Sequence, residues 1–134
     1  MNKIILYIDT ANEETRVSIF RNSRILNEKK WNGHGDLSVS LLREIDSILL
    51  ESKIHKGDLD EVVVNKGPGS YTGLRIGITV ANFLAWSLKI EVFAGKIENG
   101  KLSITGNNKN KYILPKYFRQ AHITRSKKKF NQKA

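Results

Sequence analysis

Apolar and polar positions in the first 31 residues predict three consecutive β-strands. Residues 4–8 form a short apolar run, residues 15–20 alternate, and residues 24–31 follow a second polar turn. Short runs bounded by turn residues are typical of strands. We therefore expect the chain to open with a three-stranded antiparallel meander.

A first helix is predicted from Leu37 to about residue 53. Asp36 or Ser38 can cap it by accepting a hydrogen bond from its free amides. The apolar residues that follow recur in steps of three and four, as on one stripe of a helix: Leu37, Leu41, Leu42, Ile45, Ile48 and Leu49.

A second helix is predicted over residues 72–88, and it has two candidate faces. One face is an apolar stripe of Ile76, Val80, Phe83, Leu84 and Leu88. The other is a ridge of small residues, each four apart: Gly73, Gly77, Ala81 and Ala85. Two glycines inside a helix cost about 1 kcal/mol each relative to alanine. We expect close packing against another backbone to compensate for that cost.

The remaining elements complete an α/β architecture. Residues 61–65 predict a buried strand, residues 91–94 a fifth strand, and residues 95–105 a hairpin that turns at Asn99-Gly100. The order β-β-β-α-β-α-β fits a mixed sheet with helices, as in a single ribonuclease-H-like lobe of actin, Hsp70 and the sugar kinases. This analogy concerns the fold and assigns no function.

Charge divides the chain into two parts. Residues 1–98 contain 13 basic and 13 acidic residues, whereas residues 99–134 contain 10 basic residues and no acid. We expect residues 1–105 to form the lobe and residues 106–134 a basic, partly disordered tail. Such a tail can bind RNA weakly by releasing counterions from phosphates, or can simply keep the protein dissolved. The candidate RNA contacts are Arg125, Lys127, Lys128 and Lys129.

Composition narrows the class of protein. The chain has no cysteine, which excludes a disulfide scaffold and a cysteine zinc site and fits a reducing compartment. The longest apolar-leaning stretch, residues 74–90, is interrupted by polar residues and falls short of the roughly 20 apolar residues that a membrane span needs. We expect a soluble, cytoplasmic protein without membrane contact.

The sharpest local feature is a strand-to-helix loop with the sequence Gly67-Pro68-Gly69-Ser70-Tyr71-Thr72-Gly73. Glycines permit positive φ, and a loop that enters a helix can point several amides at one spot. An anion site or a surface shaped for a partner would explain the loop, and so would a tight turn capped by Ser70 or Thr72. The loop matches neither a Walker A motif nor G-x-G-x-x-G.

Other candidate residues give weaker signals. Asp9 could hold a metal and a nucleotide, but such chemistry needs further carboxylates, so we favour a role in capping its turn. Arg75 could bind an anion, but we favour an ion pair with Glu61 or Asp9. The histidines are too widely spaced for a helical metal pair: His34, His55 and His122. We predict no catalytic residue, metal or cofactor.

The run from Gly67 to Gly77 resembles the signature of the TsaB (YeaZ) family, and residues 4–11 resemble that family's first strand. The match in order and spacing covers about residues 3–94. The family has a second lobe about as large as the first, which is missing here, while residues 113–119 resemble its Pro-x-Tyr-x-Arg ending. The chain therefore resembles a short form that lacks most of the second lobe. The catalytic relative TsaD shares a Gly-Pro-Gly loop, but its metal-binding His-x-x-x-His is absent from this sequence.

The resemblance implies a non-catalytic scaffold subunit. TsaB proteins pair with TsaD through helices of the first lobe, in a bundle that resembles their own homodimer. The ATPase TsaE joins the assembly, and TsaD forms threonylcarbamoyladenosine on tRNA. The implied interface residues are Leu41, Ile45, Ile48, Gly73, Gly77, Phe83 and Trp86, with Trp86 as the expected hot spot. The implied family-signature loop residues are Gly67, Pro68, Gly69, Ser70, Thr72 and Arg75.

Two other classes of function stay open. A nucleotide-binding enzyme of the same fold would need Asp9 and the loop after residue 66 to hold nucleotide and magnesium. A stand-alone basic RNA-binding protein would depend on residues 120–134 and could dispense with the lobe. A third possibility is that loss of the second lobe left a chain that only homodimerises.

Overall fold

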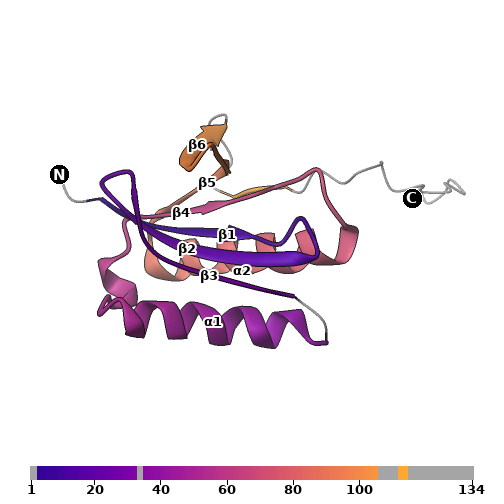
Figure 1. The fold of residues 1–134 in the computed structure, drawn as a ribbon, viewed down its shortest axis with the longest axis horizontal. Helices are drawn as coiled ribbons and strands as arrows, with labels where there is room; N and C mark the ends of the chain where they lie inside the picture. The colour runs from indigo at the N-terminus through magenta and orange to yellow at the C-terminus, as the bar shows by residue number, and fades with distance from the viewer. Residues whose placement is uncertain (1–2, 33–34, 106–111, 115–134) are drawn as a thin grey trace, which may run out of the picture.

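The computed structural model describes residues 3–32, 35–105 and 112–114. Its centre is a six-stranded sheet of order β3-β2-β1-β4-β5-β6 (Figure 1). The strands are β1 (Ile4–Asp9), β2 (Glu14–Arg21), β3 (Arg24–Asn32), β4 (Glu61–Val64), β5 (Glu91–Glu98) and β6 (Lys101–Thr105). Strands β1, β4 and β5 run parallel, and the other neighbours are antiparallel. The predicted opening meander and the terminal hairpin are both confirmed.

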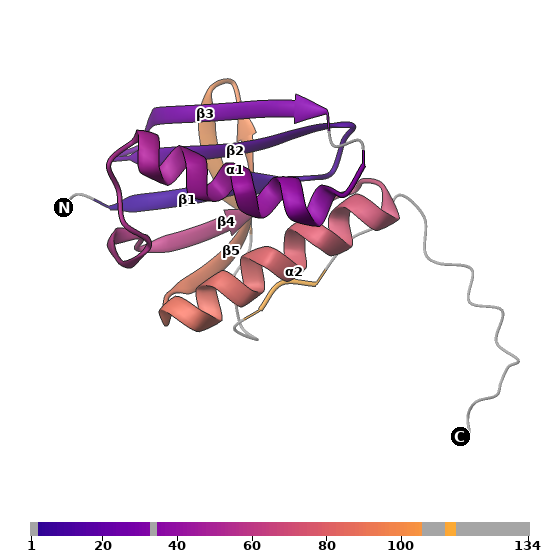
Figure 2. The same cartoon turned by 90° about the horizontal axis from the view of Figure 1, so that it is seen from below.

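Two long helices cover one face of this sheet (Figures 1 and 2). They are α1 (Leu37–Glu51) and α2 (Tyr71–Leu88), and a short 3-10 turn, η1 (Lys56–Asp58), precedes β4. Helix α2 connects the parallel strands β4 and β5, so it has to cross over one face of the sheet. Helix α1 begins after Asp36, whose carboxylate accepts a hydrogen bond from the Val39 N–H at 3.4 Å. Both helices were predicted to within two residues at each end.

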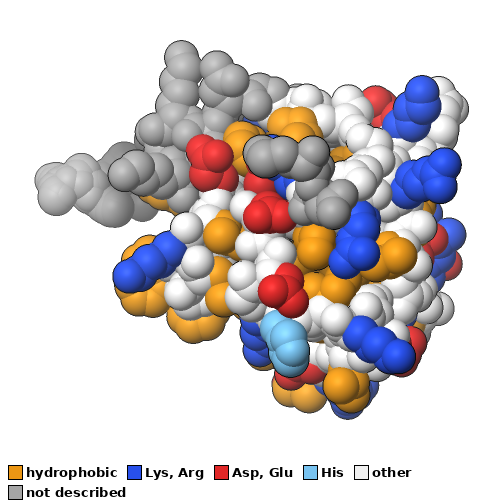
Figure 3. Space-filling model, turned by 90° about the vertical axis from the view of Figure 1, so that its left-hand side faces the viewer, with side chains coloured by type: hydrophobic (Ala, Val, Ile, Leu, Met, Phe, Trp, Pro, Cys, Tyr) orange, Lys and Arg blue, Asp and Glu red, His pale blue; other side chains and the backbone are white. Residues whose placement is uncertain are grey.

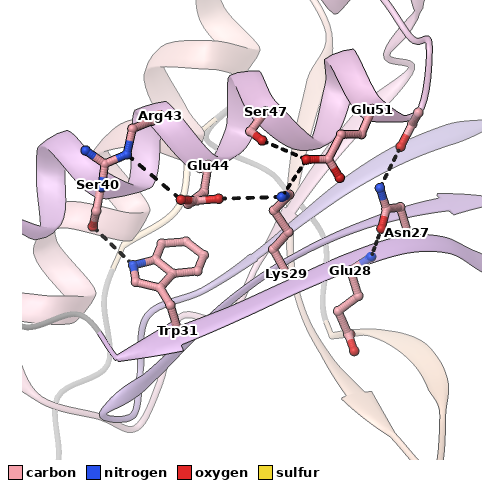
Figure 4. Close-up of polar contacts among 10 residues, drawn as sticks. Asn27, Glu28, Lys29, Trp31, Ser40, Arg43, Glu44, Ser47 and Glu51 are labelled. Carbon is pink, nitrogen blue, oxygen red and sulfur yellow. Dashed lines mark hydrogen bonds and ion pairs between the residues drawn. The ribbon is translucent and has the colours of Figure 1, made fainter.

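Polar contacts fasten α1 to the edge strand β3 (Figure 4). The indole nitrogen of Trp31 donates to the hydroxyl of Ser40 at 3.2 Å. Farther along, Lys29 pairs with Glu51 at 2.8 Å and with Glu44 at 3.8 Å. One side of α1 is therefore occupied by β3, which leaves its opposite side next to α2.

The main core lies between the sheet and the helices, and its largest fully buried members include Leu6, Ile8, Leu41, Ile48 and Leu74. A smaller cluster lies on the other face of the sheet. Tyr7, Phe20 and Val63 are fully buried there, with Phe93 and Leu102 of the terminal hairpin packed against them. The sheet thus has apolar packing on both faces, as the β-branched β4 predicted.

The face of α2 that meets the sheet differs from the predicted apolar stripe. Its buried residues are Gly73, Leu74, Gly77, Ile78, Ala81, Leu84 and Ala85. The ridge of small residues therefore faces the sheet of its own lobe, while Phe83 lies on the exposed side. The small side chains let α2 approach the strands closely, so the predicted close packing occurs within the chain.

The terminal hairpin turns where the sequence predicted. Asn99 and Gly100 both have positive φ, 53° and 76°, the combination that a two-residue type I′ turn requires. Strand β5 is longer than predicted and runs on into this hairpin.

The lobe extends beyond this hairpin. Ile113 is 8% exposed and belongs to the main core, so the lobe includes a residue that was assigned to the tail. Neither helix in the described part of the chain is long and apolar enough to cross a membrane.

Candidate protein-binding face

The end of β1 and the start of α2 fit tightly against each other. The Thr10 hydroxyl donates to the Gly73 carbonyl at 2.6 Å. A Cβ added at Gly77 would overlap the Thr10 side chain, and one added at Gly69 would lie 2.5 Å from the Ala11 carbonyl oxygen. The glycines of the signature loop therefore serve packing inside the lobe.

The loop before α2 is shaped by its own backbone contacts. Gly67 has φ +110°, a conformation that L side chains rarely adopt, and its N–H donates to the Asn65 side-chain oxygen at 2.9 Å. Ser70 occupies the N-cap position, but its side chain makes no capping hydrogen bond. The cap position proposed for Ser70 is therefore confirmed without a side-chain hydrogen bond, whereas Thr72 lies inside α2 and is not the cap. Pro68 and Thr72 are exposed.

Arg75 does not form the predicted ion pair. Its guanidinium lies 5.6 Å from the centre of the Tyr71 ring, one turn away on the exposed side of α2. Glu61 instead pairs with Lys3 at 2.8 Å, on the other side of the lobe from the start of α2. The predicted ion pair is wrong because Arg75, four residues after the start of α2, lies on the exposed side of the helix.

Asp9 closes the turn after β1. Its carboxylate accepts from the Tyr7 hydroxyl and from the Ala11 N–H, both at 3.0 Å. Burial, followed by the nearby Asp9 charge, raises the pKa of Tyr7, so its hydroxyl stays protonated and donates. These contacts fit the turn-capping role that the sequence favoured.

A groove of about 490 Å³ opens beside this turn, between the starts of α1 and α2. Two carboxylates, Glu13 and Asp36, are among the lining residues in the described part of the chain, and none of these described lining residues is a lysine or arginine. The Ser38 hydroxyl, followed by the Val39 N–H, lowers the pKa of Asp36, so this carboxylate carries charge at neutral pH. The lining charges therefore oppose binding of a polyphosphate. In the described residues, no three histidine or acidic side chains come close enough to hold a metal ion.

The outward sides of α1 and α2 expose large apolar side chains. We call this surface the outer helix face and define it by Val39, Leu42, Leu50, Tyr71, Phe83 and Trp86, which are between 48% and 80% exposed. The Phe83 and Trp86 rings lie 6.2 Å apart. A shallow groove of about 270 Å³ runs between Ser38 of α1 and the α2 residues Ile76 and Val80. Clustered exposed apolar side chains mark interaction surfaces.

The structure corrects most of the predicted interface. Leu41, Ile45 and Ile48 are at most 2% exposed because the main stripe of α1 packs onto the sheet. Gly73 and Gly77 are buried against Thr10. None of these five residues is available to a partner. Phe83 and Trp86, at 59% and 76% exposure, are available, and their contact with a partner stays a prediction.

Other residues of the outer helix face could have been found from the sequence. Val39 and Leu50 are apolar but do not belong to the main apolar stripe of α1, and this pattern indicates that they lie outside the core.

The remaining candidate residues His34, Arg125, Lys127, Lys128 and Lys129 lie outside the described residues. At the end of the molecule seen in Figure 3, basic, acidic and apolar side chains are interspersed.

The fold has solved counterparts. A structure titled YeaZ from Pseudomonas aeruginosa superposes with a TM-score of 0.65 over 78% of this chain and 65% of that one, at 21% sequence identity. The arrangement is an α/β lobe of the ribonuclease-H-like type, with a mixed sheet and two helices on one face. The fold class is therefore the ribonuclease-H-like lobe that the order of elements in the sequence predicted.

Comparison of sequences gives the family. The family model described as TsaD, tRNA N6-adenosine threonylcarbamoyltransferase, matches residues 34–94. The tRNA threonylcarbamoyladenosine biosynthesis protein TsaB of Bacillus subtilis is 40% identical over 90 residues, which cover 67% of this chain and 39% of that protein. TsaB of Buchnera aphidicola from Schizaphis graminum is 36% identical over 93 residues, covering 69% and 44%. The chain belongs to the TsaB (YeaZ) family, and it spans less than half the length of these two relatives.

Proposed function

We propose that this protein is a non-catalytic subunit for threonylcarbamoyladenosine formation on tRNA, and that it pairs with TsaD through the outer helix face. The observation that carries the proposal is the group of exposed apolar side chains on α1 and α2. Trp86, next to Phe83, is the expected centre, because large aromatic residues dominate interface energies. Burying this area would contribute about 25 cal/mol per Å².

The groove beside β1 supports a non-catalytic role. In an enzyme of this fold, nucleotide phosphates would need positive charge or a metal near Asp9. Here the groove is lined by Glu13 and Asp36, and Asp9 is engaged with Tyr7 and Ala11. Calorimetry with ATP and magnesium is expected to give no binding heat.

The same face would pair two copies when TsaD is absent. A two-fold homodimer uses one surface on both chains, so TsaD and a second copy would compete for Trp86 and its neighbours. Adding TsaD should therefore convert a dimer of this chain into a mixed complex, measured by size-exclusion chromatography with light scattering.

The direct test is co-purification of this chain with the TsaD protein of its own organism, followed by mass spectrometry of the tRNA. We expect a stable complex, and more threonylcarbamoyladenosine when this chain and TsaE are present than with TsaD alone. No complex, together with modification that is independent of this chain, would contradict the proposal.

A further inference from the structure

One side chain of α2 holds the C-terminal segment at residues 112–114. The Asn82 amide nitrogen donates to the Ile113 carbonyl at 3.0 Å, and the Asn82 side-chain oxygen accepts from the Ile113 N–H at 2.8 Å. Both bonds go to the backbone of Ile113, so the Asn82 side chain makes the two hydrogen bonds that a neighbouring β-strand would otherwise make. The segment lies beside α2 on the side away from α1 (Figure 2).

The attachment exposes the residues on either side of Ile113. Successive side chains of an extended segment point in opposite directions. Ile113 is buried in the main core, whereas Tyr112 and Leu114 are 52% and 62% exposed. Trp86 lies four residues after Asn82, so the two share one side of α2. The exposed apolar residues of the segment therefore border the Trp86 side of the outer helix face.

We propose that residues 112–114 form the rim of the partner-binding face beyond α2, and that Asn82 is the positioning residue for this rim. The inference rests on the proposed function, and the occupant is TsaD. The family model of that enzyme matches residues 34–94, which contain both helices, so TsaD can offer a comparable helix pair. The polar contacts of β3 bound the α1 side, and the segment bounds the α2 side with Tyr112 and Leu114.

The test uses the full chain with the paired substitutions Tyr112→Ser and Leu114→Ser. Both side chains are exposed, so the melting temperature is expected to stay unchanged. Affinity for TsaD, measured by calorimetry, is expected to fall about tenfold. The matched control is Ile25→Ser with Leu26→Ser, which are 41% and 47% exposed on edge strand β3 and should leave the affinity unchanged.

Asn82→Ala tests the positioning role separately. We expect faster hydrogen exchange at the Ile113 amide and a loss of TsaD affinity equal to that of the Tyr112 and Leu114 pair. Combining all three substitutions should add nothing further, because they remove one shared feature.

Each outcome decides the proposal. Unchanged TsaD affinity after the Tyr112 and Leu114 substitutions overturns the rim, while binding by the unsubstituted chain still upholds the proposed function. Unchanged affinity after Asn82→Ala overturns its positioning role. Weakened self-association with unchanged TsaD affinity assigns the rim to a homodimer and also overturns the proposal. Failure of the unsubstituted chain to bind TsaD overturns both the rim and the proposed function.

Discussion

Thr10 at the end of β1 donates a hydrogen bond to the carbonyl of Gly73 in the first turn of α2, with 2.6 Å between the two oxygens. The two residues are 63 positions apart in the sequence. One turn farther along α2, Gly77 lies against the Thr10 side chain with no room for a Cβ. The signature loop therefore fixes the start of α2 on the sheet, and through it the direction of the outer helix face.

Gly77→Ala should destabilise the lobe. The new methyl group would overlap Thr10, whose hydroxyl is held by Gly73, so the helix has to shift. We expect the free energy of unfolding to fall by about 1–3 kcal/mol, as for other overpacked sites. Urea denaturation measures this, and an unchanged or raised midpoint would contradict the packing described here.

A double-mutant cycle with Thr10→Ala is the control for this prediction. Thr10→Ala removes the hydroxyl and methyl groups, which are the two nearest atoms that the new Cβ would meet, and leaves only the Thr10 Cβ at 3.0 Å. Gly77→Ala should therefore cost less in the Thr10→Ala background than in the unsubstituted chain. Equal costs in both backgrounds would mean that another contact limits the site.

Tyr7→Phe should destabilise the lobe without changing its fold. The Tyr7 hydroxyl is buried, and it donates to the Asp9 carboxylate that shapes the following turn. Losing a hydrogen bond to a charged group costs about 1–3 kcal/mol. The comparison is Tyr112→Phe, whose ring is half exposed and whose substitution should change the unfolding midpoint little. Equal shifts of the unfolding midpoint for Tyr7→Phe and Tyr112→Phe would contradict this prediction.

Glu51→Gln should change the acid side of the stability profile. The hydrogen bond from Lys29, followed by one from Ser47, holds the pKa of Glu51 below its ordinary value of 4.5. A carboxylate with a lowered folded pKa contributes stability above its unfolded pKa, and this contribution is lost as pH falls through the folded pKa. The variant should therefore melt at a lower temperature at neutral pH and lose less on acidification below pH 4.5.

The control for Glu51 is Glu98→Gln at the end of β5. Glu98 is exposed and forms no ion pair within the described part of the chain. Its substitution should leave the shape of the melting profile against pH unchanged. Parallel profiles for Glu51→Gln and the unsubstituted chain would show that the Lys29 contact adds no stability.

The sequence predicted the elements well because each was encoded locally. The meander, both helices and the Asn99-Gly100 turn follow from periodicity and turn residues close together in the chain. The face that α2 presents to the sheet could not be predicted in this way. Its small ridge and its apolar stripe were both plausible core faces, and the choice depends on Thr10, which is far away in the sequence.

The candidate interface was harder to predict for the same reason. Leu41 and Ile45 were assigned to a partner because an apolar stripe alone does not reveal what covers it. Once the sheet covers that stripe, the residues that are left outside become the candidates, such as Val39 and Trp86. The Asn82 contact with Ile113 had no local signal, since 31 positions separate the two residues.

The central claim is that the exposed side of α2 binds TsaD, and Trp86→Ala tests it most directly. Trp86 is 76% exposed, so its truncation should leave the melting temperature of the chain unchanged. Calorimetric titration with TsaD should show at least about a tenfold loss of affinity relative to the unsubstituted chain, since a tenfold change is about 1.4 kcal/mol and hot spots exceed that. Equal affinity of the two proteins for TsaD would contradict the account.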